Sequence, residues 1–325
     1  WAINPFGYST ASDASSSVSP LAPTRGLFAG GMRSGGNPTE VIQYYQINSG
    51  GENAQDFGDL ATVNNANNMA VSSSTRAIFI GGTNGGSTYN DKMNYVTIAS
   101  TGNSTEFGQL SERTNNQGTG RGALDGAGCG NSTRGVMARG AHIGSGETED
   151  IIYVTIASAG GDTDFGDLSG VVQYAGALSS TTRGIILRNT GNIQTEYITI
   201  ASTGNATNFG LIGVSGGGGA AGASSNTRGL FATGNSTSIR YCTIASTGDF
   251  TDFGDLTQSV ANTGFTSDSI TAVRSGGYVG SPTNSEVNTM DQTVIATLGN
   301  STDFGDILAG TLGGASCSDS HGGLA

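Results

Sequence analysis

The phrase "TDFGDL" occupies Thr163–Leu168 and returns unchanged at Thr251–Leu256. A near copy, "TDFGDI", stands at Thr302–Ile307, and three looser copies precede it. Together they place six Phe-Gly pairs at spacings of 50, 58, 44, 44 and 51 residues. A repeat of roughly 40–50 residues is typical of propellers and solenoids, so internal repetition comes first. The repeated phenylalanines are Phe57, Phe107, Phe165, Phe209, Phe253 and Phe304.

Two further anchors precede each Phe-Gly pair. One is an arginine in "TRG" or "TRA", namely Arg25, Arg76, Arg134, Arg183 and Arg228, with Arg274 in a degenerate "VRS". The other is a tyrosine segment such as "YVTIASTG", Tyr95–Gly102. In four units this tyrosine lies 12 residues before the phenylalanine. Because this interval is constant, the variation in repeat length lies in loops.

Each unit contains four stretches that favour strands. "RAIFIGG" (Arg76–Gly82), "MNYVTIAS" (Met93–Ser100) and "TEFGQL" (Thr105–Leu110) are rich in β-formers and end at turn residues. The fourth stretch consists of Gly, Ala and Ser, which suits a crowded position where backbones approach closely. We therefore predict an all-β protein, a β-propeller of four-stranded blades, with the small-residue strand innermost and the Phe-Gly strand outermost.

The chain ends decide how many blades are expected. "NPFGYS" (Asn4–Ser9) looks like a seventh Phe-Gly strand, and residues 312–325 look like an inner strand followed by an arginine-type strand with His321 at the arginine position. We predict seven blades, the last shared by both termini, with six blades as the alternative. One domain, 1–325, is expected, with repeat units 10–60, 61–110, 111–168, 169–212, 213–256 and 257–307 and closing strands 1–9 and 308–325.

Composition limits the function. The net charge is −12 and one lysine is present, so the basic footprint of a nucleic-acid binder is missing. No apolar run reaches about 18 residues, so membrane insertion is not expected. The three cysteines are widely spaced, so we expect each of them to be a small buried hydrophobic residue. Neither of the two histidines has the spacing of a catalytic triad or a metal site. We expect no enzyme activity and no cofactor.

The repeat resembles known families. The Gly pair, the tyrosine and the fourth-strand aromatic are similar to the kelch propeller pattern, although the aromatic here is Phe rather than Trp. "TIASTGNATNFG" (Thr199–Gly210) and "TIASTGNSTEFG" (Thr97–Gly108) more closely resemble the "TIASTGNATDFGDL" repeat proteins of tailed bacteriophages of marine bacteria. This resemblance covers Thr24–Ile307. It implies a non-enzymatic virion structural protein, in the virion or outside the cell, whose partners are other virion proteins or a host-surface glycan or protein.

The acids of the repeat have two other interpretations. Asp162, Asp164 and Asp167 in one unit, and Asp249, Asp252 and Asp255 in another, could supply oxygens to Ca²⁺. Leu211 interrupts this pattern elsewhere, so we expect no metal that every blade requires. The recurring arginines and acids more simply form structural ion pairs within or between blades. A ring of arginines that lines the channel and binds an anion is the alternative.

Loops that vary in length leave one corner of each blade, so they share one face. Loops on a rigid scaffold are common sites of recognition. The candidate binding residues there are Arg33, Asn37, Asn84, Tyr89, His142, Glu147, Tyr278 and Asn284. The sequence thus favours a phage tail or fibre propeller used for host attachment or as a virion scaffold. The alternative functions are a tailspike polysaccharide depolymerase and a cellular glycan-binding adhesin. The alternative interpretation of the loops is that they vary in length because nothing constrains them.

Overall fold

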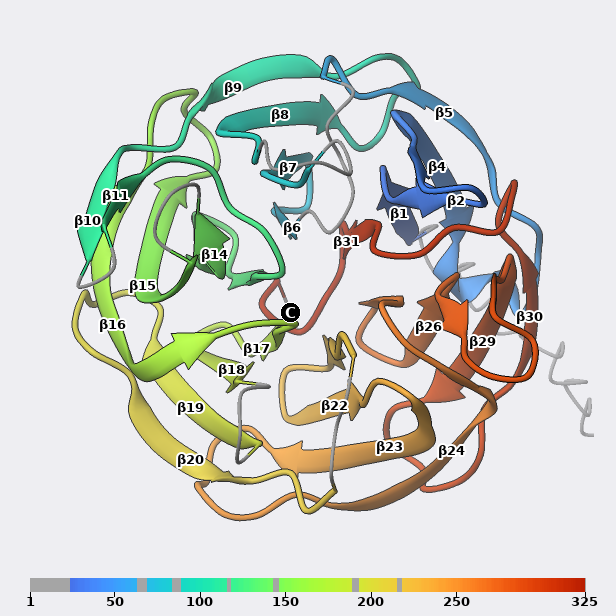
Figure 1. The fold of residues 1–325 in the computed structure, drawn as a ribbon. Coiled ribbons are helices and arrows are strands. Elements are labelled where there is room, and N and C mark those ends of the chain that lie inside the picture. Colours follow the sequence, from blue (N-terminus) through green and yellow to red (C-terminus); the bar gives the residue numbers. More distant parts are fainter. Residues whose placement is uncertain are drawn as a thin grey trace, which may run out of the picture.

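The computed structural model describes residues 24–62, 69–83, 89–115, 118–142, 146–188, 193–214 and 218–324. These residues form six four-stranded antiparallel blades around a central channel, as Figure 1 shows. Within them the one helical segment is the short η1 (Ile47–Ser49), and no helix is both long and apolar enough to span a bilayer. The prediction of an all-β propeller is confirmed.

Every blade runs outward from a short inner strand. Blade 1 consists of β31 (Ala315–Ser318), β1 (Arg25–Ala29), β4 (Val41–Gln46) and β5 (Gln55–Asp59). Blade 2 consists of β6 (Met69–Ser72), β7 (Arg76–Ile80), β8 (Lys92–Thr97) and β9 (Thr105–Gln109). Blade 3 consists of β12 (Ala127–Gly130), β13 (Arg134–Ala138), β15 (Gly146–Thr155) and β16 (Thr163–Val172), with β14 (Ala141–His142) beside β15.

The other three blades follow the same order. Blade 4 consists of β17 (Gly176–Ser179), β18 (Arg183–Arg188), β19 (Gln194–Thr199) and β20 (Thr207–Leu211). Blade 5 consists of β21 (Ala221–Ser224), β22 (Arg228–Ala232), β23 (Ser236–Thr243) and β24 (Thr251–Val260). Blade 6 consists of β25 (Gly264–Ser267), β26 (Thr271–Ser275), β29 (Thr289–Val294) and β30 (Thr302–Asp306). Small hairpins are β2 (Met32–Arg33) with β3 (Asn37–Pro38), β10 (Arg113–Asn115) with β11 (Gly118–Gly120), and β27 (Tyr278–Val279) with β28 (Ser285–Glu286).

The prediction of seven blades is wrong, and the six-blade alternative is the one found. The C-terminal strand β31 pairs with β1, from Gly26 opposite Ser318 to Ala29 opposite Ala315. It therefore supplies the inner strand of blade 1 rather than starting a further blade. The predicted strand at Asn4–Ser9 lies outside the described residues. His321 does not begin another strand, because the chain turns into the channel after Ser318.

The Phe-Gly pair joins one blade to the next. In β16, Phe165 is an extra residue in a bulge, since Ile151 faces Gly166 while Ile152 faces Asp164. The N–H of Gly204, in the turn of the next blade, donates to the Phe165 carbonyl at 2.7 Å. A Cβ on Gly166 would lie 2.5 Å from the Gly204 backbone. The glycine is thus required because a neighbouring backbone takes the place of its side chain.

The phenylalanine side chain packs on the buried side of the same contact between neighbouring blades, which we name the seam. Phe165 is buried and meets Tyr153 edge-on, with ring centroids 6.1 Å apart. Such edge contacts are favourable beyond the apolar area they bury. Four other blades repeat this tyrosine–phenylalanine contact at 6.0–6.3 Å, in the pairs Tyr44–Phe57, Tyr95–Phe107, Tyr197–Phe209 and Tyr241–Phe253.

Candidate functional site

The two ends of the channel carry different kinds of connection. The turn face carries the tight turns that precede the arginines and the "IASTGN" turns. The loop face carries the connections between second and third strands and the crossovers from each outer strand to the next inner strand. The length-varying connections therefore share one face by topology.

The candidate binding residues are spread over four blades of the loop face. Arg33 and Asn37 face each other in the β2–β3 hairpin of blade 1. Tyr278 of blade 6 donates its hydroxyl hydrogen to the Asn284 side chain at 3.4 Å. In blade 3, His142 lies opposite Gly146 on β14, and Glu147 lies one residue further along β15. Asn84 lies outside the described residues.

Tyr89 and Glu147 belong to a cluster that the sequence did not reveal. Asp125, in the crossover to blade 3, raises the pKa of the Tyr174 phenol by its charge. Burial, Glu147 and Tyr89 raise the same pKa further. Asp125 and Tyr174 line one hollow at the channel mouth, and Tyr89 and Glu147 lie near enough for their charges to act on the Tyr174 phenol. The four residues come from the loop of blade 2, the start of β15 and the crossovers to blades 3 and 4. We name Tyr89, Asp125, Glu147 and Tyr174, with Asn262 across the mouth, the mouth cluster.

Strained backbone marks three members of the mouth cluster. Asp125, Tyr174 and Asn262 have φ of 57°, 49° and 51°, in the left-handed region. At the matching point before β31 the chain uses Gly313 with φ of 65°, the residue type that this conformation favours. A bulky tyrosine in this region is an outlier, and such outliers cluster at functional sites. An alignment of the crossover sequences on the inner strand that follows each of them would have shown that Asp125, Tyr174, Asn262 and Gly313 occupy the same position.

The mouth is shallow. Asp125, Tyr174, Asn262 and Gly313 line a hollow of about 70 Å³. The hollows along the channel beneath it are equally small, about 90 Å³ among the inner strands and about 60 Å³ at the turn face. These volumes hold a few waters, whereas ligand pockets commonly exceed about 300 Å³. A ligand at this face would therefore lie across the mouth rather than enter the channel.

A ring of serines closes the channel at the turn face. Five inner-strand hydroxyls donate to a backbone carbonyl of the adjacent blade at 2.6–2.9 Å, from Ser72, Ser179, Ser224, Ser267 and Ser318. Blade 3 has Gly130 at this position, so the Ser72 carbonyl receives no hydroxyl from it. His321 lies there instead, with its Nε2 3.2 Å from that carbonyl.

The contacts of His321 define its tautomer. Its Nδ1 accepts the Gly323 N–H at 3.1 Å, so Nε2 carries the hydrogen that is donated to Ser72. Burial lowers the pKa of His321 to about 4. The Gly322 N–H adds a bond of 2.9 Å to the Ser224 carbonyl. Residues 319–324, which we name the C-terminal tail, thus plug the channel; Figure 1 shows the C-terminus at its centre.

The repeated arginines hold the blades together by contacts other than the predicted ion pairs. Arg134 stacks over the Tyr153 ring at 4.2 Å and donates to the Ile200 carbonyl of the next blade at 2.9 Å. Arg25, Arg76, Arg183 and Arg228 repeat both contacts. Within the described part of the chain none of the five forms an ion pair. They are also absent from the residues that line the channel there.

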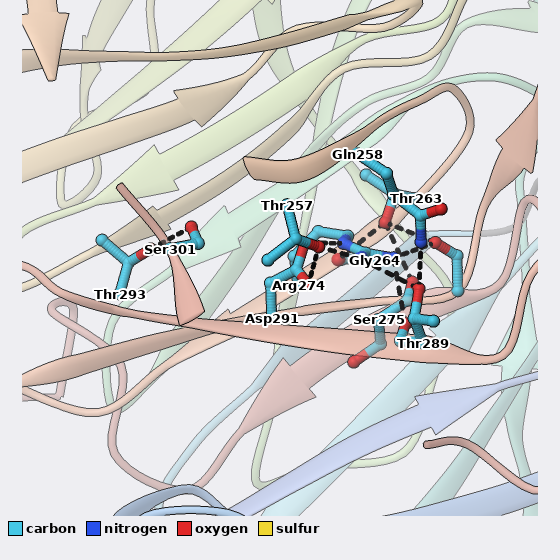
Figure 2. A network of polar contacts seen from close by, with 11 residues as sticks. Thr257, Gln258, Thr263, Gly264, Arg274, Ser275, Thr289, Asp291, Thr293 and Ser301 are labelled. Atoms are coloured by element: carbon cyan, nitrogen blue, oxygen red, sulfur yellow. Dashed lines mark hydrogen bonds and ion pairs between the residues drawn. The ribbon is translucent and has the colours of Figure 1, made fainter. Parts of the chain in front are cut away.

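Arg274 does not share this register. Strand pairing places Thr271 opposite Val294, as Arg76 is opposite Thr97, so Thr271 stands at the arginine position. Arg274 instead lies inside blade 6, where it pairs with Asp291 at 2.6 Å and both side chains are fully buried. Figure 2 shows the two side chains pointing toward each other, with Thr257 beside them. Its guanidinium also donates to the Gly276 and Thr289 carbonyls, so the buried charges are well satisfied.

The acidic candidates are mostly occupied by the fold. Asp249 accepts the Leu211 N–H at 2.9 Å, as Asn205 accepts the Asp167 N–H at 3.0 Å, and Asp162 occupies a similar turn. Asp162 and Asp164 also pair with Arg113 at 3.0 and 3.3 Å. Asp252 lies 3.8 Å from Arg240, and Asp255 accepts the Thr237 hydroxyl. No group of three His, Cys, Asp or Glu among the described residues could hold a metal ion.

The remaining titratable groups fit structural roles. Cys129, Cys242 and Cys317 are free and buried, and burial raises the pKa of each thiol to about 12. Asp150 and Asp167 face each other across β15 and β16, and burial raises the pKa of both carboxyls. Arg113 offsets this rise at both.

Comparison with protein-family models finds no match for the chain, and a search of curated proteins finds none either.

Proposed function

We propose that the protein is a non-enzymatic module of a phage virion, tail- or fibre-associated, that attaches to a host-surface glycan through its loop face. The observation that carries this proposal is the mouth cluster. Two aromatic rings, two carboxylates and an amide lie on the face that also carries the length-varying loops. Fold alone does not decide function in propellers, so the site has to supply the argument.

The chemistry of the cluster suits a sugar. The Tyr174 ring offers an apolar surface with a polar hydroxyl at its tip. Asp125, Glu147 and Asn262 offer acceptors and an amide donor for hydroxyl groups. No arginine or lysine belongs to the cluster, and the net charge of −12 repels anionic polymers. The glycan we propose is therefore neutral or amino-substituted rather than acidic.

Glycan-array binding with Tyr174→Asn tests the proposal. Asparagine already occupies the matching left-handed position at Asn262, so this substitution removes the ring while retaining the backbone conformation. We expect a loss of about tenfold or more in affinity, which corresponds to about 1.4 kcal/mol. Leu211→Thr, an exposed change at the outer edge of blade 4, is the control and should bind as the wild type does.

Three outcomes would contradict the proposal. Equal binding by Tyr174→Asn would remove the mouth cluster from recognition. Absence of binding to any glycan, together with contacts between the loop face and other virion subunits in an assembled particle, would make the protein a scaffold. Release of shortened oligosaccharides from a bound polymer would make it a depolymerase.

A further inference from the structure

Blade 6 differs from the other five at the seam with blade 1. Where the others have the stacked arginine and tyrosine, blade 6 has Thr271 and Gln292. Gln292 reaches across with one bond of 3.1 Å from its amide to the Gly50 carbonyl. Two large side chains are thus replaced by smaller ones, and the seam is left partly open.

Three aliphatic side chains appear at the same place. Ile270, Val294 and Leu298 are 49%, 51% and 55% exposed. Ile270 accepts the backbone bond from Ile295, as a threonine does in each of the other five blades. Val294 pairs with Thr271, as Thr97, Thr155, Thr199 and Thr243 pair with arginines. Blade 6 has therefore exchanged polar surface residues for apolar ones at matching positions.

These exchanges border a groove. Thr271, Gln292, Val294, Leu298, Asn300 and Thr302 are among its lining residues, and its volume is about 400 Å³. This volume lies in the range of ligand-binding pockets, about 300–1,000 Å³. None of its lining residues is charged. We name this hollow the blade 6 groove.

The chain itself passes beside the blade 6 groove. Thr24, the first described residue, donates its hydroxyl hydrogen to Asp268 at 3.1 Å, two residues before Ile270. The 23 residues before it carry one charged side chain, Asp13, and several apolar ones, among them Trp1, Ile3 and Phe6. At about 3.3 Å per extended residue, a few residues suffice to reach the groove from Thr24.

We propose that the segment Trp1–Pro23 packs its apolar side chains into the blade 6 groove. The segment, with Asp13 as its one charged side chain, supplies apolar side chains to an uncharged groove, and it ends within a few residues of the groove edge. The exposed aliphatics then become an internal contact, which agrees with the rule that contiguous exposed apolar patches mark interaction surfaces. This inference is independent of the glycan proposal, because the groove lies at a different position from the mouth cluster.

Trp1 is the sole tryptophan of the 325 residues, so its fluorescence reports the docking directly in the full chain. We expect blue-shifted emission and weak quenching by acrylamide in the wild type. The double variant V294T/L298T gives blade 6 polar residues of the kind found in other blades. It should shift the emission to the red and raise the quenching constant several-fold. Leu211→Thr, which changes an equally exposed leucine in blade 4, should change neither.

Circular dichroism and thermal unfolding establish that the double variant remains folded, which we expect because both positions are exposed. Emission that is the same in the wild type and V294T/L298T overturns the proposal. Emission that shifts with protein concentration, together with a dimer in sedimentation that V294T/L298T abolishes, also overturns it, since the occupant is then a second copy of the chain. Concentration-independent emission that V294T/L298T shifts supports it.

Discussion

The glycine of each Phe-Gly pair has a role that its acidic neighbours lack. Gly166 has φ of 145° and meets the Gly204 backbone where a Cβ would stand. The acids around it vary because they bind whatever polar group lies nearby, such as Arg113 beside Asp164. The repeated phrase is therefore an interface between blades, which explains why its carboxylates tolerate replacement and its glycine does not.

Gly166→Ala should be more destabilising than Gly204→Ala. Both glycines have positive φ, but a Cβ on Gly204 meets nothing within 4 Å. The comparison therefore isolates the contact between blades from the backbone strain. We expect the free energy of unfolding to fall by about 1–3 kcal/mol more for Gly166→Ala, the usual effect of overpacking. Urea unfolding measures the difference. Equal losses would show that the contact between the two blades adjusts to a methyl group at position 166 without lowering the free energy of unfolding further.

His321 should make stability depend on pH. Its folded-state pKa of about 4 is below the ordinary 6.5, so the unfolded chain binds the extra proton first as the pH falls. Its contribution to stability is complete above pH 6.5 and is lost as the pH falls from about 6.5 to about 4. Protonation would also place a hydrogen on Nδ1, against the Gly323 N–H.

His321→Gln provides the matched comparison, because a glutamine amide can donate to the Ser72 carbonyl without titrating. Thermal unfolding of the two proteins should differ in its pH dependence between about 6.5 and 4 and be parallel above that window. Asp150, Asp167 and Asp319 have raised pKa values and titrate in both proteins, so their contribution cancels in the difference. Identical pH profiles would mean that His321 is not held neutral in the channel.

At the scale of elements, the arginine–tyrosine stack is the recurring link between blades. Arg134→Leu removes the stack on Tyr153 and the bond to the Ile200 carbonyl. We expect a loss of about 1–2 kcal/mol from these two contacts together. A double-mutant cycle with Tyr153→Leu measures the coupling of the pair. Strictly additive losses would indicate that the stack contributes nothing and that the bond to the carbonyl carries the effect.

Sequence reasoning succeeded for features set by local pattern. The strands expected over residues 76–82, 93–100 and 105–110 correspond to β7, β8 and β9, because alternation and turn residues act within a few positions. It could not place Asp125, Tyr174 and Asn262 together, because the ring geometry joins crossovers that are 49–137 residues apart. It also placed Arg274 with the other repeated arginines because of its residue type alone, whereas the strand pairing shows that Thr271 occupies that position.

At the scale of the whole molecule, ring closure was the least predictable property. A strand such as "ASCS" fits the inner position of any blade, so its sequence does not state which blade it joins. Only the pairing of β31 with β1, at opposite ends of the chain, fixes the number at six. Closure removes the open sheet edge that β1 would otherwise present along the channel.

Truncation separates closure from the channel plug. A chain ending at Gly314 lacks β31, so β1 loses its partner and the serine ring loses Ser318. We expect this variant to unfold without a single cooperative transition and to aggregate through the exposed edge of β1.

A chain ending at Ser318 keeps β31 and loses only the C-terminal tail. It should remain a folded monomer whose stability no longer shows the His321 dependence between pH 6.5 and 4. Calorimetry and size-exclusion chromatography distinguish the two variants. If the Gly314 truncation folds as cooperatively as the wild type, the contacts between neighbouring blades hold the ring without the closing strand.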